Sequence, residues 1–192
     1  MAEAEELLLV DRIRAGDTSA WTDLLTGYQN RLYAVCFRMV RNPETAADLT
    51  QDAMVKIIQG LDRYDGRARL STWMIRITMN VCLSWLRAQE LRRHASLDAP
   101  QSGKAPRTIA QSLDQSREQP ADARVEYDER HEALLAALFE LAPDHRAILL
   151  LRDAHDMEYD QIAQVLDIAV GTVKSRLFRA RTALRNLIEP KQ

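Results

Sequence analysis

Residues 158–185 read EYDQIAQVLDIAVGTVKSRLFRARTALR, and this stretch predicts two short helices joined by a tight turn. Apolar residues recur every three or four positions in both helices, which gives each helix one face to bury. They are Tyr159, Ile162, Ala163 and Leu166 in the first helix and Val173, Leu177, Ala180, Leu184, Leu187 and Ile188 in the second. The pattern is typical of a helix-turn-helix.

The second of these helices carries a strong excess of positive charge. From Gln161 to the end of the chain there are six Lys and Arg residues against two acids. Basic side chains bind DNA phosphates, and side chains near the start of a helix in the major groove read base edges. The segment therefore predicts DNA binding, with a solvated basic surface helix as the alternative.

Charge is unevenly distributed along the 192 residues, although the net charge is only -2. Residues 63–93 hold seven bases and two acids, whereas residues 131–160 hold two bases and seven acids. Two basic blocks alternating with acidic ones indicate a chain that binds DNA through the first kind and protein through the second.

The N-terminal part predicts a bundle of amphipathic helices. Polar caps at Asp17 to Ser19 and at Asn42, the latter followed by Pro43, mark two helix starts. The expected helices run from about Glu3 to Ala15, through Trp21 to Met39, from Pro43 to Leu61, and from Ser71 to about Arg93. No segment alternates with a period of two residues, so the expected fold class is all-α, with two small helical domains.

A change of composition separates the two domains. Residues 94–126 are rich in Pro, Ser, Gln and Gly and poor in large apolar residues, which predicts a flexible linker. The expected organisation is a first domain over 1–93, the linker over 94–126, and a four-helix second domain over 127–192.

Several classes of site are not indicated. The four histidines lack metal-ligand spacing, no Gly-rich phosphate loop is present, and Cys36 and Cys82 fall in apolar helical patterns as core thiols. We expect no catalytic residues, metal or cofactor, and a function based on binding.

The acidic start and short apolar run Leu7–Val10 predict neither a secretory signal nor membrane insertion, so we expect a cytoplasmic protein.

Three motifs occur in an order that resembles one protein family. They are DLTQD at 48–52, STWMIRITMN at 71–80 and GTVKSRLFRAR at 171–181. The chain resembles an RNA polymerase sigma factor of the extracytoplasmic-function (ECF) group, which keeps only the second and fourth sigma regions. The resemblance covers about residues 20–93 and 127–188.

The motifs depart from the family pattern at four positions. Asp52 replaces the usual Glu, and Met74 and Thr78 replace Leu and Ala. The Asp and Met changes are mild because charge and approximate volume are kept. Leu70 stands where an aromatic is common. If this position helps to shape the pocket for an unstacked base, the lost aromatic ring would weaken stacking there.

The resemblance implies a role for each region, with core RNA polymerase, promoter DNA and an anti-sigma factor as partners. It implies polymerase contact by Asp48, Gln51 and Asp52, for which a solvated acidic helix face is the alternative. It implies binding of the minus-thirty-five element by Thr172, Lys174, Ser175, Arg176 and Arg179. It implies binding of the minus-ten element by Arg63, Tyr64, Arg67, Arg69, Ser71, Thr72, Trp73, Arg76, Asn80 and Arg87.

Some of these residues have a second interpretation. Trp73 lies on an apolar stripe, which favours a core position over a base-stacking one. Asn80 has the geometry to read an adenine edge or to cap local backbone. At the level of the whole chain, the alternatives are a free-standing helix-turn-helix repressor or activator, and a helical signalling adaptor or an enzyme on an unfamiliar bundle.

Overall fold

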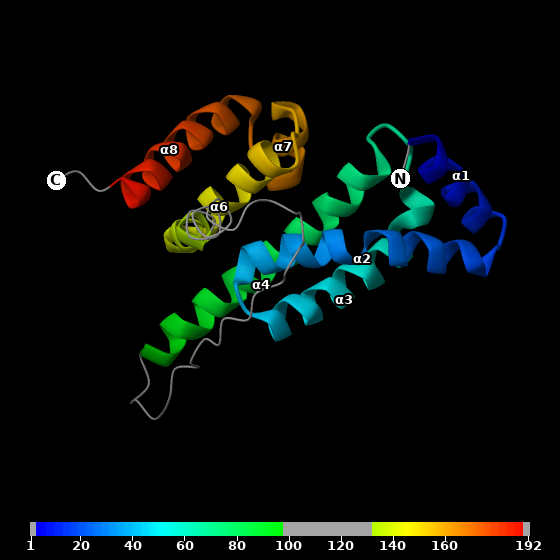
Figure 1. Cartoon of the computed structure of the whole chain (residues 1–192), viewed down its shortest axis with the longest axis horizontal. Coiled ribbons are helices and arrows are strands. Elements are labelled where there is room, and N and C mark those ends of the chain that lie inside the picture. Colours follow the sequence, from blue (N-terminus) through cyan, green and yellow to red (C-terminus); the bar gives the residue numbers. More distant parts are fainter. Residues whose placement is uncertain (1–2, 98–131, 190–192) are drawn as a thin grey trace, which may run out of the picture.

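The computed structural model describes residues 3–97 and 132–189, and both stretches are helical (Figure 1). The first stretch contains α1 (Glu3–Arg14), α2 (Thr18–Val40), α3 (Pro43–Gly60) and α4 (Leu70–Leu97), with a short 3-10 turn, η1 (Leu61–Arg63), after α3. Neither described stretch contains a strand. The predicted all-α class is therefore confirmed.

The predicted caps start α2 and α3. The Asp17 carboxylate accepts a hydrogen bond from the Ser19 N–H at 2.9 Å, and the Asn42 side-chain oxygen accepts one from the Thr45 N–H at 2.8 Å. Between the two helices, Arg41 adopts a left-handed conformation with φ 54. This turn lets α3 fold back along α2.

The core of the first domain lies between α2, α3 and α4. Cys36 of α2 and Cys82 of α4 are both fully buried, and their Sγ atoms lie 3.6 Å apart. The contact with Cys36, together with burial, raises the pKa of the Cys82 thiol. The prediction that both cysteines are core thiols is confirmed.

Two polar contacts fasten α1 to this core. The hydroxyl of Tyr28 on α2 donates a hydrogen bond to the buried carboxylate of Glu6. The Arg14 guanidinium donates to the backbone oxygen of Tyr64 at 2.5 Å. Because Tyr64 follows η1, α1 holds one end of the loop that leads into α4.

Helix α4 differs from its predicted bounds. It begins at Leu70 and continues to Leu97, so the predicted linker over 94–126 starts inside a helix. The rest of that linker, residues 98–126, lies outside the described residues. The Leu70 side chain is 1% exposed in the core of the first domain. In this conformation the Leu70 side chain packs inside the domain, and an influence of this position on base stacking stays a prediction.

The second domain begins with a helix over 132–140, and the predicted break before Pro143 is confirmed. It continues with α6 (Pro143–Leu149), one π-helical turn, η2 (Leu150–Ala154), then α7 (Tyr159–Leu166) and α8 (Val170–Ile188). Between α7 and α8, Asp167 has φ 53, and the Ile168 N–H bonds to the Ala163 oxygen at 3.0 Å. These features form the tight turn of the helix-turn-helix.

The buried face of α8 is shorter than predicted. Val173, Leu177 and Ala180 are buried, but Leu187 and Ile188 are 44% and 47% exposed. Helix α8 has 19 residues, whereas α6 and α7, on which it packs, have 7 and 8. Its last turn therefore projects beyond them.

The two domains pack against each other. Helices α6 and α7 contact α4, and α6 also contacts α2. Figure 1 shows the second domain lying along α4, with α3 on the other side of the first domain. Within the described ranges, no helix is both long and apolar enough to span a bilayer.

Candidate nucleic-acid interface

The outward face of α8 presents most of the residues predicted to bind the minus-thirty-five element. Thr172, Lys174, Ser175 and Arg179 are exposed, while Arg176 is half-buried. Val173, Leu177 and Ala180 lie on the buried face of α8. The predicted polar residues lie on the opposite, solvent-facing side of the same helix. The first two turns of α8 thus carry cations next to hydroxyl groups.

Two acids of the second domain hold arginines of α8. Arg176 contacts Asp144 at 3.2 Å, and Arg181 contacts Asp153 at 2.5 Å. The Asp153 contact raises the pKa of Arg181. Of the two pairs, the exposed one between Arg181 and Asp153 contributes little to stability.

Phe178 belongs to the same face and was not among the predicted site residues. Its ring is 73% exposed, the most exposed large apolar side chain in the described residues. A ring at this place on a groove-facing helix suits the methyl group of thymine. In the sequence, the position of Phe178 away from the buried residues Val173 and Leu177 is the signal that could have identified it as a site residue.

The loop after η1 presents a second set of cations. Arg63, Arg67 and Arg69 are exposed, and Arg67 contacts Asp65 at 3.2 Å. Gly66 has φ 73, a left-handed conformation that glycine adopts without strain. This turn allows the loop to place its arginines on the surface.

The aromatic residues of this loop lie inward. Tyr64 is 4% exposed, and its hydroxyl donates to the Ala68 oxygen at 2.6 Å. Its ring lies 5.4 Å from that of Trp73, which is half-buried against the core. In this conformation the Tyr64 ring fixes the loop from beneath, and its contact with a base stays a prediction. Ser71 is also buried at 9% exposure and offers no surface to DNA.

Helix α4 continues the polar surface that begins at the loop. Arg76, Asn80 and Arg87 are exposed at spacings that place them along one side of the helix, and Thr72 is half-buried at its start. Together with the loop arginines they form a cationic strip. It runs from residue 63 to residue 87.

Helix α3 presents an acidic and apolar stripe. The predicted polymerase-contact residues Asp48, Gln51 and Asp52 are all exposed. Val55 and Ile58, at 50% and 43% exposure, continue the same stripe by one and two turns. Neither apolar residue was predicted as a contact. Their positions off the buried stripe of α3, which contains Ala46, Leu49, Ala53 and Ile57, are the sequence signal that could have indicated them.

Two family models match the chain over most of these surfaces. Sigma-70 region 2 matches residues 24–92, and Sigma-70, region 4 matches residues 131–184. The chain is 31% identical over 189 residues to the ECF RNA polymerase sigma-E factor of Escherichia coli (strain K12), which covers 95% of this chain and 94% of that protein.

The chain belongs to the ECF family of RNA polymerase sigma factors. It is also 28% identical over 176 residues to the ECF RNA polymerase sigma factor SigW of Bacillus subtilis (strain 168), covering 92% of both proteins. Its fold is similar to that of the sigma factor RpoE in complex with the anti-sigma factor NepR from Bartonella quintana. That likeness has a TM-score of 0.65 and 23% identity, and covers 89% of this chain and 98% of the other.

The two matches assign the surfaces of this sigma factor to its two DNA-binding regions. The region 2 match contains α3, the arginine loop and most of α4, whereas the region 4 match contains the helix-turn-helix. The protein therefore acts in promoter-directed initiation of transcription.

Proposed function

We propose that this sigma factor binds core RNA polymerase through α3. We further propose that its two DNA-binding surfaces, the cationic strip and α8, each bind one of the two elements of a promoter. The observation that carries the proposal is the segregation of charge. Exposed cations gather on α8 and along residues 63–87, while α3 is acidic.

The contact with polymerase uses the exposed stripe of α3. Asp48, Gln51 and Asp52 supply charge and hydrogen bonding, and Val55 and Ile58 supply apolar area next to them. Apolar side chains surrounded by polar ones are common in protein interfaces. The stripe suits a helical partner with a basic surface.

The minus-ten element binds the cationic strip after its two DNA strands have separated. Arg63, Arg67 and Arg69 hold the phosphate backbone, while Thr72, Arg76, Asn80 and Arg87 lie along the path that leads away from the loop. Exposure of Asn80 favours base reading over a local cap. Tyr64, Ser71 and Trp73 support the loop from below rather than stack on bases.

The minus-thirty-five element is read in the major groove by α8. Thr172, Lys174, Ser175, Arg176 and Arg179 lie in its first turns, where a recognition helix contacts base edges. Phe178 adds an apolar contact to this set. The nucleotide chemistry belongs to the polymerase, so this subunit needs no catalytic residue or cofactor of its own.

An anti-sigma factor is a further partner that we infer. Two solved structures of similar fold are complexes, one of the sigma factor RpoE with the anti-sigma factor NepR and one of CnrH with the cytosolic domain of CnrY. A partner that covers α3, the strip or α8 would hold the factor inactive until a stress or another signal releases it. All these partners place the protein in the cytoplasm.

Reconstitution with purified core polymerase tests the proposal. The complete chain is expected to bind core and to start transcription at specific sites in a genomic library. Asp52→Lys should weaken core binding at least tenfold, because it reverses charge at the centre of the α3 stripe. The matched control Asp11→Lys makes the same change on exposed α1 and should bind as wild type. Promoter binding without polymerase, or no core binding at all, would contradict the proposal.

A further inference from the structure

Helix α1 shares a core with both ends of the arginine loop, which joins η1 to α4 over residues 64–69. The region 2 match begins at residue 24, so α1 lies outside it. The inward side chains of α1 belong to one buried cluster with residues that flank or begin the loop. The α1 residues are Leu9, Val10 and Ile13, and those of the loop ends are Leu61, Tyr64 and Leu70. Packing against α1 therefore supports the loop at both of its ends.

Polar contacts fix α1 itself against α2. The buried Glu6 carboxylate accepts a hydrogen bond from the Tyr28 hydroxyl. Nearer the end of α1, the Arg12 guanidinium donates to the Asp17 carboxylate at 2.9 Å and to the Ser19 hydroxyl at 3.1 Å. Because α1 is held at two places along its length, it can hold another segment in turn.

Arg14, in the last turn of α1, contacts the loop directly. Its guanidinium donates a hydrogen bond to the backbone oxygen of Tyr64 at 2.5 Å, although the two residues are 50 positions apart in the sequence. A charged donor makes a stronger hydrogen bond than a neutral one. The contact fixes the backbone at the first residue of the loop.

Tyr64 extends this constraint across the loop. Its hydroxyl donates a hydrogen bond to the backbone oxygen of Ala68 at 2.6 Å. Between these two residues, the Arg67 N–H donates to the Asp65 carboxylate at 3.1 Å. Side-chain hydrogen bonds thus close the backbone from residue 64 to residue 68, which carries Arg67.

An ordered loop binds a DNA strand at lower cost than a loose one. Ordering a loop at the moment of binding costs conformational entropy, and a loop that is ordered beforehand avoids this cost. The exposed side chains of Arg63, Arg67 and Arg69 start from a backbone that is already fixed. The contact made by Arg14 therefore has a consequence for strand capture.

We propose that α1 positions the arginine loop for capture of the separated minus-ten strand, with Arg14 as the positioning residue. The inference rests on the proposed function of the loop. Arg14 acts through the backbone of Tyr64 and not by contact with DNA. Its contribution is to promoter opening and not to the attachment of the factor to polymerase.

Amide hydrogen exchange of the free, full-length protein measures the order of the loop without DNA or polymerase. Arg14→Met removes the guanidinium and keeps an unbranched side chain. It should speed exchange of the amides of residues 65–69 by about three- to tenfold, as for the loss of one hydrogen bond from a charged donor. Arg14→Lys keeps a charged donor and should stay within about twofold of the wild-type rate.

Promoter opening measures the functional effect. Core polymerase with the full-length factor is mixed with a promoter that carries 2-aminopurine in the minus-ten element, and the rise in fluorescence follows strand separation. Arg14→Met should slow opening by about three- to tenfold and leave affinity for core polymerase unchanged. The salt slope of promoter binding should also be unchanged, because loss of a phosphate contact would lower it by about one.

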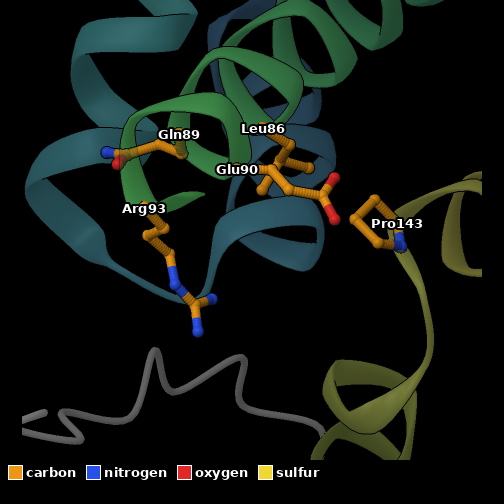
Figure 2. A pocket seen from close by; sticks show the side chains of 5 residues that line it. All are labelled: Leu86, Gln89, Glu90, Arg93 and Pro143. Carbon is orange, nitrogen blue, oxygen red and sulfur yellow. The ribbon is translucent and has the colours of Figure 1, made fainter. Parts of the chain in front are cut away.

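Arg92→Met is the matched control. Arg92 is also an exposed arginine that donates to a backbone oxygen, that of Ala88 at 3.2 Å, but it lies ~33 Å along α4 from Leu70 at a rise of ~1.5 Å per residue. Figure 2 shows this end of α4, where Glu90 extends toward Pro143 of the second domain. The control should leave both loop exchange and promoter opening as in the wild type.

A second variant acts on the loop from its other end. Tyr64→Phe removes the hydrogen bond to the Ala68 oxygen and keeps the ring, so it should also speed loop exchange and slow opening. Because both changes loosen one loop, the double variant with Arg14→Met should slow opening by less than the product of the two single effects.

Faster loop exchange in Arg14→Met with an unchanged opening rate would overturn the inference. Slower opening with unchanged exchange and a lower salt slope would overturn it as well, since Arg14 would then be a phosphate contact. If the wild-type factor opens no promoter with core polymerase, the proposed function fails and the inference fails with it. Failure of Arg14→Met alone leaves the proposed function standing.

Discussion

Arg179 is the residue on which the proposed reading of the minus-thirty-five element depends most directly. It is exposed on α8, in the part of the helix expected to face base edges. Arg179→Ala is expected to weaken promoter binding by about 1–3 kcal/mol and to relax specificity at one base pair. Fluorescence anisotropy of the complex with core polymerase on the wild-type promoter and single-base variants, at several salt concentrations, measures both effects.

Arg185→Ala is the matched control for this change, because Arg185 is an exposed cation nearer the end of the same helix. Its loss should weaken binding evenly across sequences and lower the salt slope by about one, as for a phosphate contact. Unchanged binding by Arg179→Ala would remove Arg179 from both roles.

Charged site residues could be located from the sequence more readily than aromatic ones. Arg63, Arg67 and Arg179 are exposed, as the cost of burying a charge leads us to expect, whereas the buried Arg146 is surrounded by backbone carbonyls that offset this cost. An aromatic ring is stable either beneath a loop or on its surface, and periodicity does not decide between them. The burial of Tyr64 could not be predicted for this reason, since only the packing of α1, η1 and α4 shows it.

The start of α3 depends on the cap at Asn42, and the acidic stripe depends on the start of α3. Asn42→Ala removes the acceptor of the Thr45 N–H and should lower the free energy of unfolding by about 1 kcal/mol. Urea denaturation measures the loss. Asn42→Asp keeps an acceptor at the cap and should unfold near the wild-type midpoint; equal loss in both variants would show that the hydrogen bond is unimportant.

Helix starts could be predicted here more closely than helix ends. Asp17 and Asn42 mark starts by local hydrogen bonds, which depend only on neighbouring residues. Helix α4 continues beyond the predicted end at Arg93 to Leu97, and the π-helical turn at Leu150–Ala154 was not predicted from the local sequence either. The exposed last turn of α8 was missed because Leu187 and Ile188 continue the apolar period past the helices that cover it.

The docking of the two domains could not be predicted from the sequence. The apolar stripes of α2 and α4 indicate burial, but not that α6 and η2 cover part of them. Arg146 appears in the sequence as one more surface cation, and its buried place becomes clear only when carbonyls from both domains surround it. Contacts between distant segments carry no local pattern, so the packing of the two domains is seen only in the structure.

His155, after η2, makes the stability of the whole molecule sensitive to pH. Burial, then the charges of Arg31 and Arg38 on α2, lower its pKa to about 4 from an ordinary value of 6.5. The folded protein therefore binds fewer protons at this site than the unfolded chain between these two values. Stability is expected to be fully present above pH 6.5 and to fall as pH decreases toward 4, by up to about 3 kcal/mol.

Urea unfolding between pH 7.5 and 4.5 tests this window. His155→Gln should flatten the decline, because the variant has no group at this position to protonate. The control His145→Gln removes another histidine of the second domain and should decline as wild type does. The Asp17 carboxyl, whose pKa is lowered to about 2 by hydrogen bonds from Ser19 and Arg12, loses its contribution only below about pH 4 and does not overlap. An unaltered slope in His155→Gln would show that other groups govern the acid sensitivity. A smaller slope would show that the folded protein keeps its full stability only while His155, a histidine of the second domain near arginines of the first, is neutral.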